Sequence, residues 1–310
     1  MSLLAPCPPS RLPPAFPIGP TSPTRIAAIH SQKGKVFGAV EGDSFRPFAV
    51  GGGALRDLRH VIKLLAAGSA PDYGEPVGLG RAKLAAPVGP LTKNVICVGK
   101  NYYDHAREFA QSGVDQSGDK QDVPADPVIF TKSPTSLADP GQKIVAGLDP
   151  THTVDYEGEF GVVIGKHAKN VKREDALDYV FGYTIVNDLT ARAVQQRHKQ
   201  WFLGKSLDGF CPVGPFVVTR DEFGVPGEQE LATYVNDERR QSARLKDMIF
   251  DVPSFIETVT AYVPLEPGDL LATGTPAGVG IGFSPPRYLQ PGDVVRIAIS
   301  GLGELTNPVV

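Results

Sequence analysis

Two glutamates separated by one residue, Glu157 and Glu159, are the first side chains in this sequence that could do chemistry. Alternate residues of an extended strand face the same side, so the two carboxylates would crowd one face. Like charges this close cost free energy unless one is protonated or a cation lies between them, and an apolar run at 162–164 follows them. A divalent metal would relieve the repulsion. The alternative is that the pair forms the solvent face of an amphipathic strand.

A third carboxylate, Asp188, follows the next apolar run, at 183–186, and precedes a helical pattern. Carboxylate oxygens suit Mg²⁺, Mn²⁺ or Ca²⁺, whereas a zinc site would also require His or Cys. Arg192 and Gln195 follow Asp188 at i+4 and i+7, so they share its helix face. They could hold a carboxylate or a keto oxygen of a substrate, or they could form an exposed polar stripe.

A possible proton-transfer pair, His105 and Glu108, lies three residues apart after a buried-strand pattern at 94–99. If the segment is helical, the two side chains share a face and can form a hydrogen bond. A histidine paired with a carboxylate can move protons near neutral pH. The alternative is a surface histidine with an unrelated glutamate beside it.

Two lysines and a threonine complete the set of candidates. Lys132 stands at the end of a predicted strand, where it could be surface charge or could face the metal. Lys205 follows the aromatic pair Trp201 and Phe202, and a lysine desolvated near a metal could act as an electrophile or a proton donor. Thr275 lies at a predicted strand end whose backbone amides suit a developing oxyanion.

The bulk properties restrict the class of protein. The chain has 310 residues, a net charge of −3 and a pI near 6.1, which argues against nucleic acid as a partner and favours a small molecule. Cys7, Cys97 and Cys211 are widely separated, so neither a disulfide framework nor a zinc site is indicated. This fits the reducing cytoplasm. No apolar run approaches the roughly 18 residues that would span a membrane.

The chain divides into three predicted parts. Residues 1–23 are too rich in proline for regular helix and are expected to form an extended arm. Residues 24–90 read as a small α+β domain with short strands and one amphipathic helix beginning near Leu55. Residues 91–310 are mostly short predicted strands. The expected fold class is therefore α+β with a strand-rich main domain.

Five segments together resemble the fumarylacetoacetate hydrolase superfamily, in the family's order and over roughly residues 94–310. They are Asn101-Tyr102-Tyr103-Asp104-His105 with Glu108, Asp155-Tyr156-Glu157-Gly158-Glu159, Asn187-Asp188 with Arg192 and Gln195, Phe202-Leu203-Gly204-Lys205-Ser206, and Thr273-Gly274-Thr275-Pro276-Ala277-Gly278. The spacing of His105 from its aspartate is similar to that of the shorter acylpyruvase, oxaloacetate decarboxylase and hydroxymuconate isomerase branch. It differs from that of the long hydrolase of tyrosine breakdown.

The resemblance implies a mixed β-roll catalytic domain, a homodimer, and Mg²⁺ or Mn²⁺ (Ca²⁺ in a crystal) as cofactor. It also implies roles for the candidate residues: metal ligation by Glu157, Glu159 and Asp188; water activation by His105 and Glu108; stabilisation of an enolate by Lys205; and substrate binding by Lys132, Arg192, Gln195 and Thr275. Specificity is expected to depend on a polar lid between residues 111 and 124 and on the aromatic side chains near Trp201.

The activity expected from the resemblance is metal-dependent hydrolysis of a C–C bond in an acylpyruvate-like 2-oxo acid, which releases pyruvate. Hydrolysis is favoured because both His105 and Glu108 are present. The alternative is decarboxylation of an oxaloacetate-like acid, or an isomerisation of the 5-carboxymethyl-2-hydroxymuconate type. A protein that binds metal and a dicarboxylate without turnover is a further possibility, but it would predict disrupted site residues, and none is disrupted.

Overall fold

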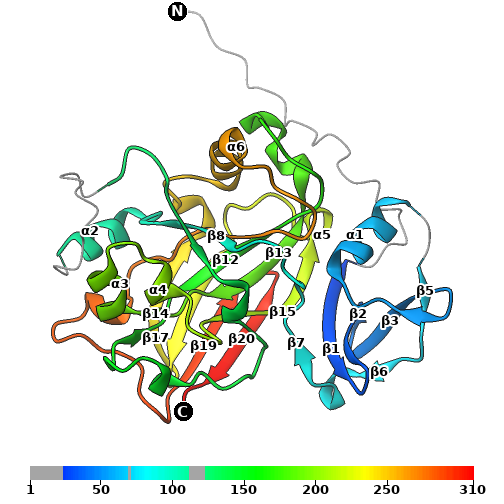
Figure 1. Ribbon diagram of the computed structural model, residues 1–310, viewed down its shortest axis with the longest axis horizontal. Helices are drawn as coiled ribbons and strands as arrows, with labels where there is room; N and C mark the ends of the chain where they lie inside the picture. The colour runs from blue at the N-terminus through cyan, green and yellow to red at the C-terminus, as the bar shows by residue number, and fades with distance from the viewer. Residues whose placement is uncertain (1–23, 69–70, 112–122) are drawn as a thin grey trace, which may run out of the picture.

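The architecture is dominated by one large twisted sheet with a smaller sheet packed against it (Figure 1). The computed structural model describes residues 24–68, 71–111 and 123–310, and within these ranges the strands form sheets of fourteen, four and two strands. The predicted arm 1–23 and most of the predicted lid lie outside the described residues. Few helices accompany the strands, so the expected α+β, strand-rich class is confirmed.

The fourteen-stranded sheet runs through both the N-terminal region and the main body. Its central path is β4-β3-β2-β1-β15-β13-β12-β18-β8-β9. Off this path, β5 and β6 pair with β3, β7 pairs with β1, and β10 pairs with β15. The strands are β1 (Arg25–Ser31), β2 (Gly34–Glu41), β3 (Ser44–Val50), β4 (Gly53–Ala54), β5 (Asp72–Tyr73), β6 (Val77–Gly78), β7 (Leu84–Ala85), β8 (Val95–Gly99), β9 (Val128–Lys132), β10 (Leu137–Ala138), β12 (Gly158–Ile164), β13 (Val180–Asn187), β15 (Cys211–Thr219) and β18 (Leu270–Ala272).

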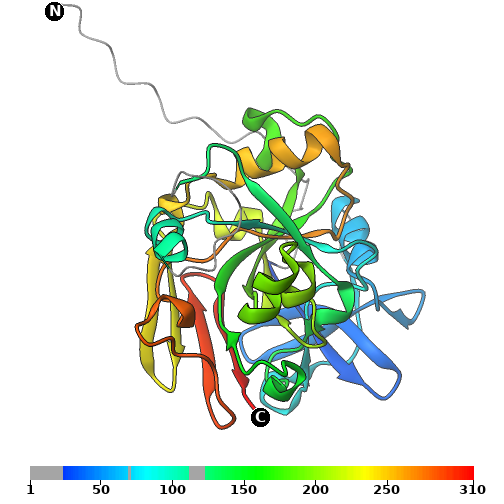
Figure 2. The same cartoon turned by 60° about the vertical axis from the view of Figure 1, so that its left-hand side comes forward.

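The two smaller sheets complete the strand framework. One has the order β17-β16-β19-β20, and the other pairs β11 with β14. Their strands are β11 (Val154–Asp155), β14 (Thr190–Ala191), β16 (Glu230–Val235), β17 (Glu238–Arg244), β19 (Val294–Ile299) and β20 (Gly303–Pro308). Figure 2 shows the yellow-to-red strands of the four-stranded sheet side by side, next to the green strands of the large sheet.

Short helices connect the strands. The α-helices are α1 (Leu58–Ala66), α2 (Tyr103–Gln111), α3 (Arg192–His198), α4 (Phe202–Lys205), α5 (Arg220–Phe223) and α6 (Val252–Tyr262). The 3₁₀ helices are η1 (Leu79–Arg81), η2 (Pro134–Ser136), η3 (Ala146–Leu148), η4 (Arg173–Tyr179), η5 (Leu245–Asp247) and η6 (Gly280–Gly282). None of the helices in the described ranges is long and apolar enough to cross a membrane.

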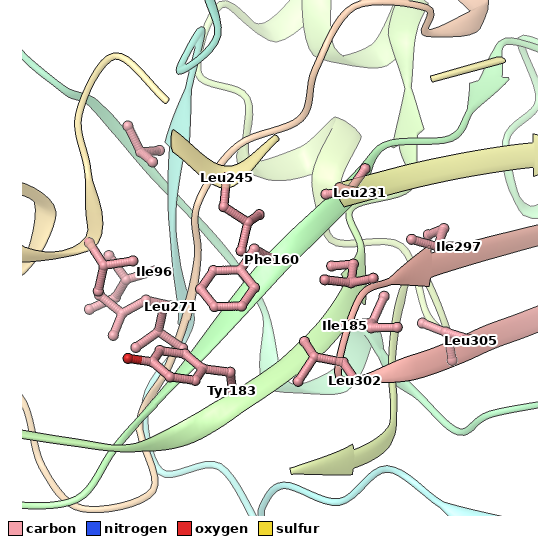
Figure 3. Close-up of a cluster of buried hydrophobic side chains, with 14 of the residues drawn as sticks. Ile96, Phe160, Tyr183, Ile185, Leu231, Leu245, Leu271, Ile297, Leu302 and Leu305 are labelled. Carbon is pink, nitrogen blue, oxygen red and sulfur yellow. The ribbon is translucent and has the colours of Figure 1, made fainter. Parts of the chain in front are cut away.

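The core of the main body lies between the large sheet and the four-stranded sheet. Phe160 on β12 stacks on Tyr183 on β13, with ring centroids 4.9 Å apart. Figure 3 shows these two rings near Leu271, with Leu231 and Ile297 of the four-stranded sheet close by. Every residue of β12 and β13 is buried, as expected for central strands covered on both faces.

The N-terminal region joins the main body through backbone pairing. β1 pairs with β15 at Arg25↔Val218 and Ile26↔Val217, and one apolar cluster contains side chains from both parts. The predicted amphipathic helix is present as α1, which is capped by the Asp57 side chain accepting from the Arg59 amide at 2.9 Å. The domain boundary near residue 90 stays a prediction, and so does the homodimer.

Replacement of a buried side chain in the N-terminal region should test whether this region unfolds with the main body. Phe37 on β2 is fully buried in the shared cluster, so Phe37→Ala should lower the free energy of unfolding by about 3–5 kcal/mol. Because the sheet is continuous, we expect one thermal transition that shifts as a whole in calorimetry. Val50→Ala, at a position 54% exposed in β3, is the matched control and should change stability by less than about 0.5 kcal/mol. A separate early transition, with the rest unchanged, would mean that residues 24–90 unfold alone.

Candidate active site

Three carboxylates converge where the two central strands of the large sheet meet. Glu157 precedes β12, Glu159 lies within it, and Asp188 follows β13 directly. The antiparallel register pairs Glu159 with Val186, and the Asp188 amide donates to the Glu157 carbonyl at 2.9 Å. The three side chains each offer an oxygen within 4.8 Å of the others, and all three are buried. The two glutamates therefore do not form a solvent-facing strand surface.

Cationic side chains surround two of these carboxylates. Lys205 Nζ lies 2.6 Å from Glu157 Oε2 and 2.6 Å from Asp188 Oδ2, so it bridges them. Lys132 Nζ lies 2.6 Å from Asp188 Oδ1 and donates to the Leu189 carbonyl at 3.0 Å. Burial works to lower the pKa of Lys205, but the charges of Asp188 and Glu157 outweigh it and raise that pKa. The Lys205 side chain is thus held in its charged form.

Glu157 and Glu159 differ in their electrostatic surroundings. Burial works to raise the pKa of Glu157, but the charges of Lys205 and Arg192 outweigh it and lower the pKa. For Glu159, burial and the negative charges of Asp188 and Glu157 together raise the pKa well above its usual range. The Gly274 amide donates to Glu159 Oε2 at 2.9 Å, which offsets this only in part. A cation placed among the three carboxylates would allow all of them to ionise.

The donor set fits a hard divalent cation. All of the candidate ligand atoms are carboxylate oxygens, which Mg²⁺ and Mn²⁺ prefer. Asp188 Oδ1 is buried and contacts Lys132 Nζ as an ion pair, yet among the described residues it accepts no hydrogen bond of acceptable geometry. A buried carboxylate oxygen in this position retains a lone pair for a metal.

The predicted histidine–glutamate pair lies on α2. His105 Nδ1 is 3.2 Å from Glu108 Oε2, as the i, i+3 spacing predicts. His105 is 5% exposed and lines the same cavity as Glu157 and Glu159, so it is not a surface histidine. Glu108 also accepts from the Gly278 amide, at 3.0 Å through Oε1 and 3.2 Å through Oε2.

A small cavity connects these groups. Its volume open to the centre of a water molecule is about 20 Å³, which is room for little more than one water. Its lining residues are Val98, Gly99, Lys100, His105, Phe109, Phe130, Glu157, Glu159, Arg192, Gln195, Trp201, Lys205 and Thr275. Lys132 is not among these lining residues, and it lies instead against Asp188.

An aromatic wall closes one side of the cavity. The Trp201 ring packs edge-on against Phe109 and Phe130, with centroid separations of 5.9 Å and 5.1 Å. A side chain at Gly99 would lie 2.4 Å from the Trp201 ring, so this glycine makes the close packing possible. Phe202 is 39% exposed and is not part of the wall. Of the aromatic pair singled out in the sequence, Trp201 is thus the one that reaches the cavity.

The predicted substrate-binding residues are held by neighbours. Arg192 Nη1 donates to Gln195 Oε1 at 3.3 Å. The Thr275 hydroxyl donates to the Gly158 carbonyl at 2.9 Å and accepts from Gln241 Nε2 at 2.7 Å. The hydroxyl proton of Thr275 is therefore already used.

Two residues of the site were given no role in the sequence analysis. Asp155 is fully buried and accepts from Arg192 Nε at 2.8 Å. It alternates with Glu157 and Glu159, so the same period of two could have identified it. Gln241 fixes Thr275 and also accepts from the Gly158 amide at 3.0 Å. It lies on β17 of the other sheet, and no local pattern singles it out.

Removal of the charge at Glu159 should stabilise the metal-free protein. The pKa of Glu159 is higher in the folded protein than in the unfolded chain, where it is about 4.5. Protonated Glu159 therefore stabilises the folded protein below pH 4.5, and this stabilisation is lost as the pH rises through the folded pKa. At pH 8 in EDTA, Glu159→Gln should therefore melt above wild type, because the substitution removes the cost of a buried carboxylate charge. Added Mg²⁺ should raise the melting temperature of the wild type only. At a Mg²⁺ concentration of 100 times its Kd, the free energy of unfolding should rise by about 2.7 kcal/mol.

Glu157→Gln is the matched control for this experiment. Lys205 and Arg192 lower the pKa of Glu157 although burial works to raise it, so the Glu157 charge stabilises the fold at neutral pH. Removal of this charge should therefore lower the melting temperature in EDTA. Both variants should lose the response to Mg²⁺. A lower melting temperature for Glu159→Gln in EDTA would contradict the electrostatic account of the three carboxylates.

The chain is similar to a known protein family and to curated relatives. The model described as fumarylacetoacetate (FAA) hydrolase C-terminal matches residues 94–310. Oxaloacetate tautomerase YisK of Bacillus subtilis (strain 168) is 48% identical over 231 residues, which covers 74% of each chain.

Solved structures agree with the family match. A 2-hydroxyhepta-2,4-diene-1,7-dioate isomerase of Mycobacterium marinum superposes with a TM-score of 0.72 at 37% identity, covering 93% of this chain and 98% of its own. A fumarylacetoacetate hydrolase of Exiguobacterium antarcticum gives a TM-score of 0.76 at 39% identity, covering 92% of this chain and 98% of its own. The match over residues 94–310 and these similarities show that the chain belongs to the fumarylacetoacetate hydrolase superfamily of enzymes.

Proposed function

We propose that this enzyme catalyses the keto–enol tautomerisation of an oxaloacetate-like 2-oxo acid. The observation that carries the proposal is that His105, paired with Glu108, and the charged Lys205 line one small cavity beside three carboxylates. Tautomerisation needs one group that moves a proton at carbon and one that stabilises the enolate. The similarity to an oxaloacetate tautomerase supports this choice over the hydrolysis favoured by the sequence.

The cofactor in this proposal is Mg²⁺ or Mn²⁺, held by Glu157, Glu159 and Asp188. Such a cation, when bound, supplies Lewis acidity to the oxygens of a 2-oxo acid. The chain itself supplies the electrostatic balance, because Lys205 and Arg192 already offset part of the carboxylate charge. The substrate carboxylates contribute further negative charge, and the cationic side chains that line the cavity would form ion pairs with them.

His105 is the proposed base and acid. Glu108 contacts Nδ1 at 3.2 Å and so orients the ring, which leaves the other ring nitrogen to take the proton from C3 of the substrate. In the enol-forming direction the C3–H bond breaks and His105 takes the proton. The C–H electron pair forms the C2–C3 double bond, the C2–O π pair moves onto the 2-oxo oxygen, and protonated His105 returns the proton to that oxygen. The reverse steps return the keto form, so no other reactant is consumed.

Lys205, Arg192 and Gln195 are the proposed substrate-holding groups. Lys205 lies between Glu157 and Asp188, and its ammonium group would donate a hydrogen bond to the enolate oxygen. Arg192 is a permanent cation whose charge would attract a substrate carboxylate. Gln195 contacts this guanidinium and would adjust with it when a carboxylate binds.

Hydrolysis of an acylpyruvate is the second candidate function. The observation in its favour is the same His105–Glu108 contact, because a histidine oriented by a carboxylate can also activate a water. Decarboxylation of oxaloacetate would use the same enolate stabilisation by Lys205 without a water. The three activities differ in which bond breaks, so they are separable by assay.

The decisive experiment follows three reactions with one enzyme preparation. They are enol-oxaloacetate conversion by absorbance, pyruvate release from oxaloacetate, and pyruvate release from acetylpyruvate, each with Mg²⁺ and with EDTA. We expect metal-dependent tautomerisation that falls about 10²–10⁴-fold in His105→Gln, the usual contribution of a general acid–base group. Glu157→Gln should lose the metal-dependent rate as well.

His167→Gln is the matched control. His167 Nδ1 lies 2.9 Å from Glu266 Oε1, so it forms the same kind of pair, but its side chain is 61% exposed and does not line the cavity. Its replacement should leave all three rates unchanged. Metal-dependent cleavage of acetylpyruvate, together with tautomerisation no faster than without enzyme, would replace the proposal with the hydrolase.

A further inference from the structure

The loop that contains η6 forms the seat of Glu108. The Gly278 amide donates to both carboxylate oxygens of Glu108, at 3.0 Å and 3.2 Å. A side chain at Gly282 would lie 2.0 Å from Glu108 Oε1, so the absence of a Cβ there leaves room for the carboxylate. Residues 278–282 thus fix the glutamate that orients His105, and we call them the seat loop.

The same seat loop binds Asp155. The amides of Gly280 and Ile281 donate to Asp155 Oδ1 and Oδ2, at 2.6 Å and 3.0 Å. Asp155 is fully buried and does not line the cavity, so it cannot touch a substrate there. Its carboxylate is nonetheless charge-paired, since Arg192 Nε donates to Oδ2 at 2.8 Å.

Arg192 carries the connection to the metal-ligand candidates. Arg192 Nη2 lies 2.6 Å from Glu157 Oε1, although the N–H direction makes this a charge contact and not an aligned hydrogen bond. Arg192 is therefore shared between Asp155 and Glu157. A continuous set of contacts joins Glu108, the seat loop, Asp155, Arg192 and Glu157.

We propose that Asp155 is a positioning residue that holds the seat of Glu108 and the guanidinium of Arg192 in one fixed arrangement across the cavity. Loss of its charge would weaken the hold on the seat loop and so on α2. It would also leave Arg192 paired with Glu157 alone, so that a metal would compete with Arg192 for Glu157. The proposal rests on the carboxylate site of the proposed function but not on the reaction.

The first readout is the fluorescence of Trp201, which is the only tryptophan of the sequence. Its ring packs against Phe109 of α2, so a loosened α2 should expose it. In Asp155→Asn without metal, we expect a higher acrylamide quenching constant than in wild type. The second readout is Mg²⁺ affinity by calorimetry, which we expect to fall about 10–100-fold, as for other residues that orient metal ligands.

Two further variants separate positioning from general loosening. Gly282→Ala should displace Glu108 without touching Asp155, so it should raise the quenching constant and leave Mg²⁺ affinity at the wild-type value. Asp269→Asn is the matched control, because Asp269 is a buried carboxylate paired with Lys93 at 2.9 Å and does not line the cavity. It should lower thermal stability and change neither readout.

Wild-type values of both quenching and Mg²⁺ affinity in folded Asp155→Asn would overturn the proposal, and so would equal changes in Asp269→Asn. If Asp155→Asn does not fold, Gly280→Ala replaces it, because the added Cβ would lie 2.6 Å from Asp155 Oδ1, and wild-type values of both readouts in that variant overturn the proposal. Failure of the proposed reaction would appear only in the turnover assays. If the three carboxylates do not bind metal, the wild type will show no Mg²⁺ binding. The quenching constants of the variants would then still test whether Asp155 positions the seat loop.

Discussion

Repulsion among buried carboxylates is the constraint on which the rest of this structure depends. Four of them lie in one region: Asp155, Glu157, Glu159 and Asp188. Each buried ion costs several kcal/mol unless it is paired and hydrogen-bonded. The compensating cations come from elements far apart in the sequence, at the end of β9, at the start of α3 and at the end of α4: Lys132, Arg192 and Lys205. The fold is organised so that these ends meet.

The topology of the large sheet explains how they meet. β12 and β13 are central and fully buried, so the residues at their ends project into a dehydrated region. β18 runs parallel to β8 beside them, which brings the segment after β18 and the start of α2 to the same end of the sheet. Asn101 joins the two, since its side-chain amide donates to the carbonyls of Thr273 and Phe250 at 2.8 Å and 2.9 Å. The ends of neighbouring strands thereby bring together a carboxylate cluster, a histidine and a glycine-rich loop.

Local patterns predicted the parts of the site that depend on local geometry. Glu157 and Glu159 followed from the alternation of a strand, and His105 with Glu108 from the turn of a helix. The bridging position of Lys205 could not be derived in this way, because its partners Asp188 and Glu157 lie 17 and 48 residues away in the sequence. Other such long-range features are the contact of Lys132 with Asp188 and the hydrogen bond of Gln241 to Thr275. The fold class was predictable because strand-length apolar runs recur along the whole chain.

The carboxylates and their cations do not by themselves choose a reaction, because tautomerisation, decarboxylation and hydrolysis all proceed through a stabilised enolate. The choice depends on what else the cavity can hold. Hydrolysis needs a water and an acyl group beside the 2-oxo acid, whereas tautomerisation needs only the substrate and a group that moves one proton. With α2 in place, Trp201, Phe109 and Phe130 leave room for little more than one water molecule. Any of the three substrates is larger than one water molecule, so the aromatic wall must move to admit it, and the space that then opens beside the 2-oxo acid determines whether a water and an acyl group also fit.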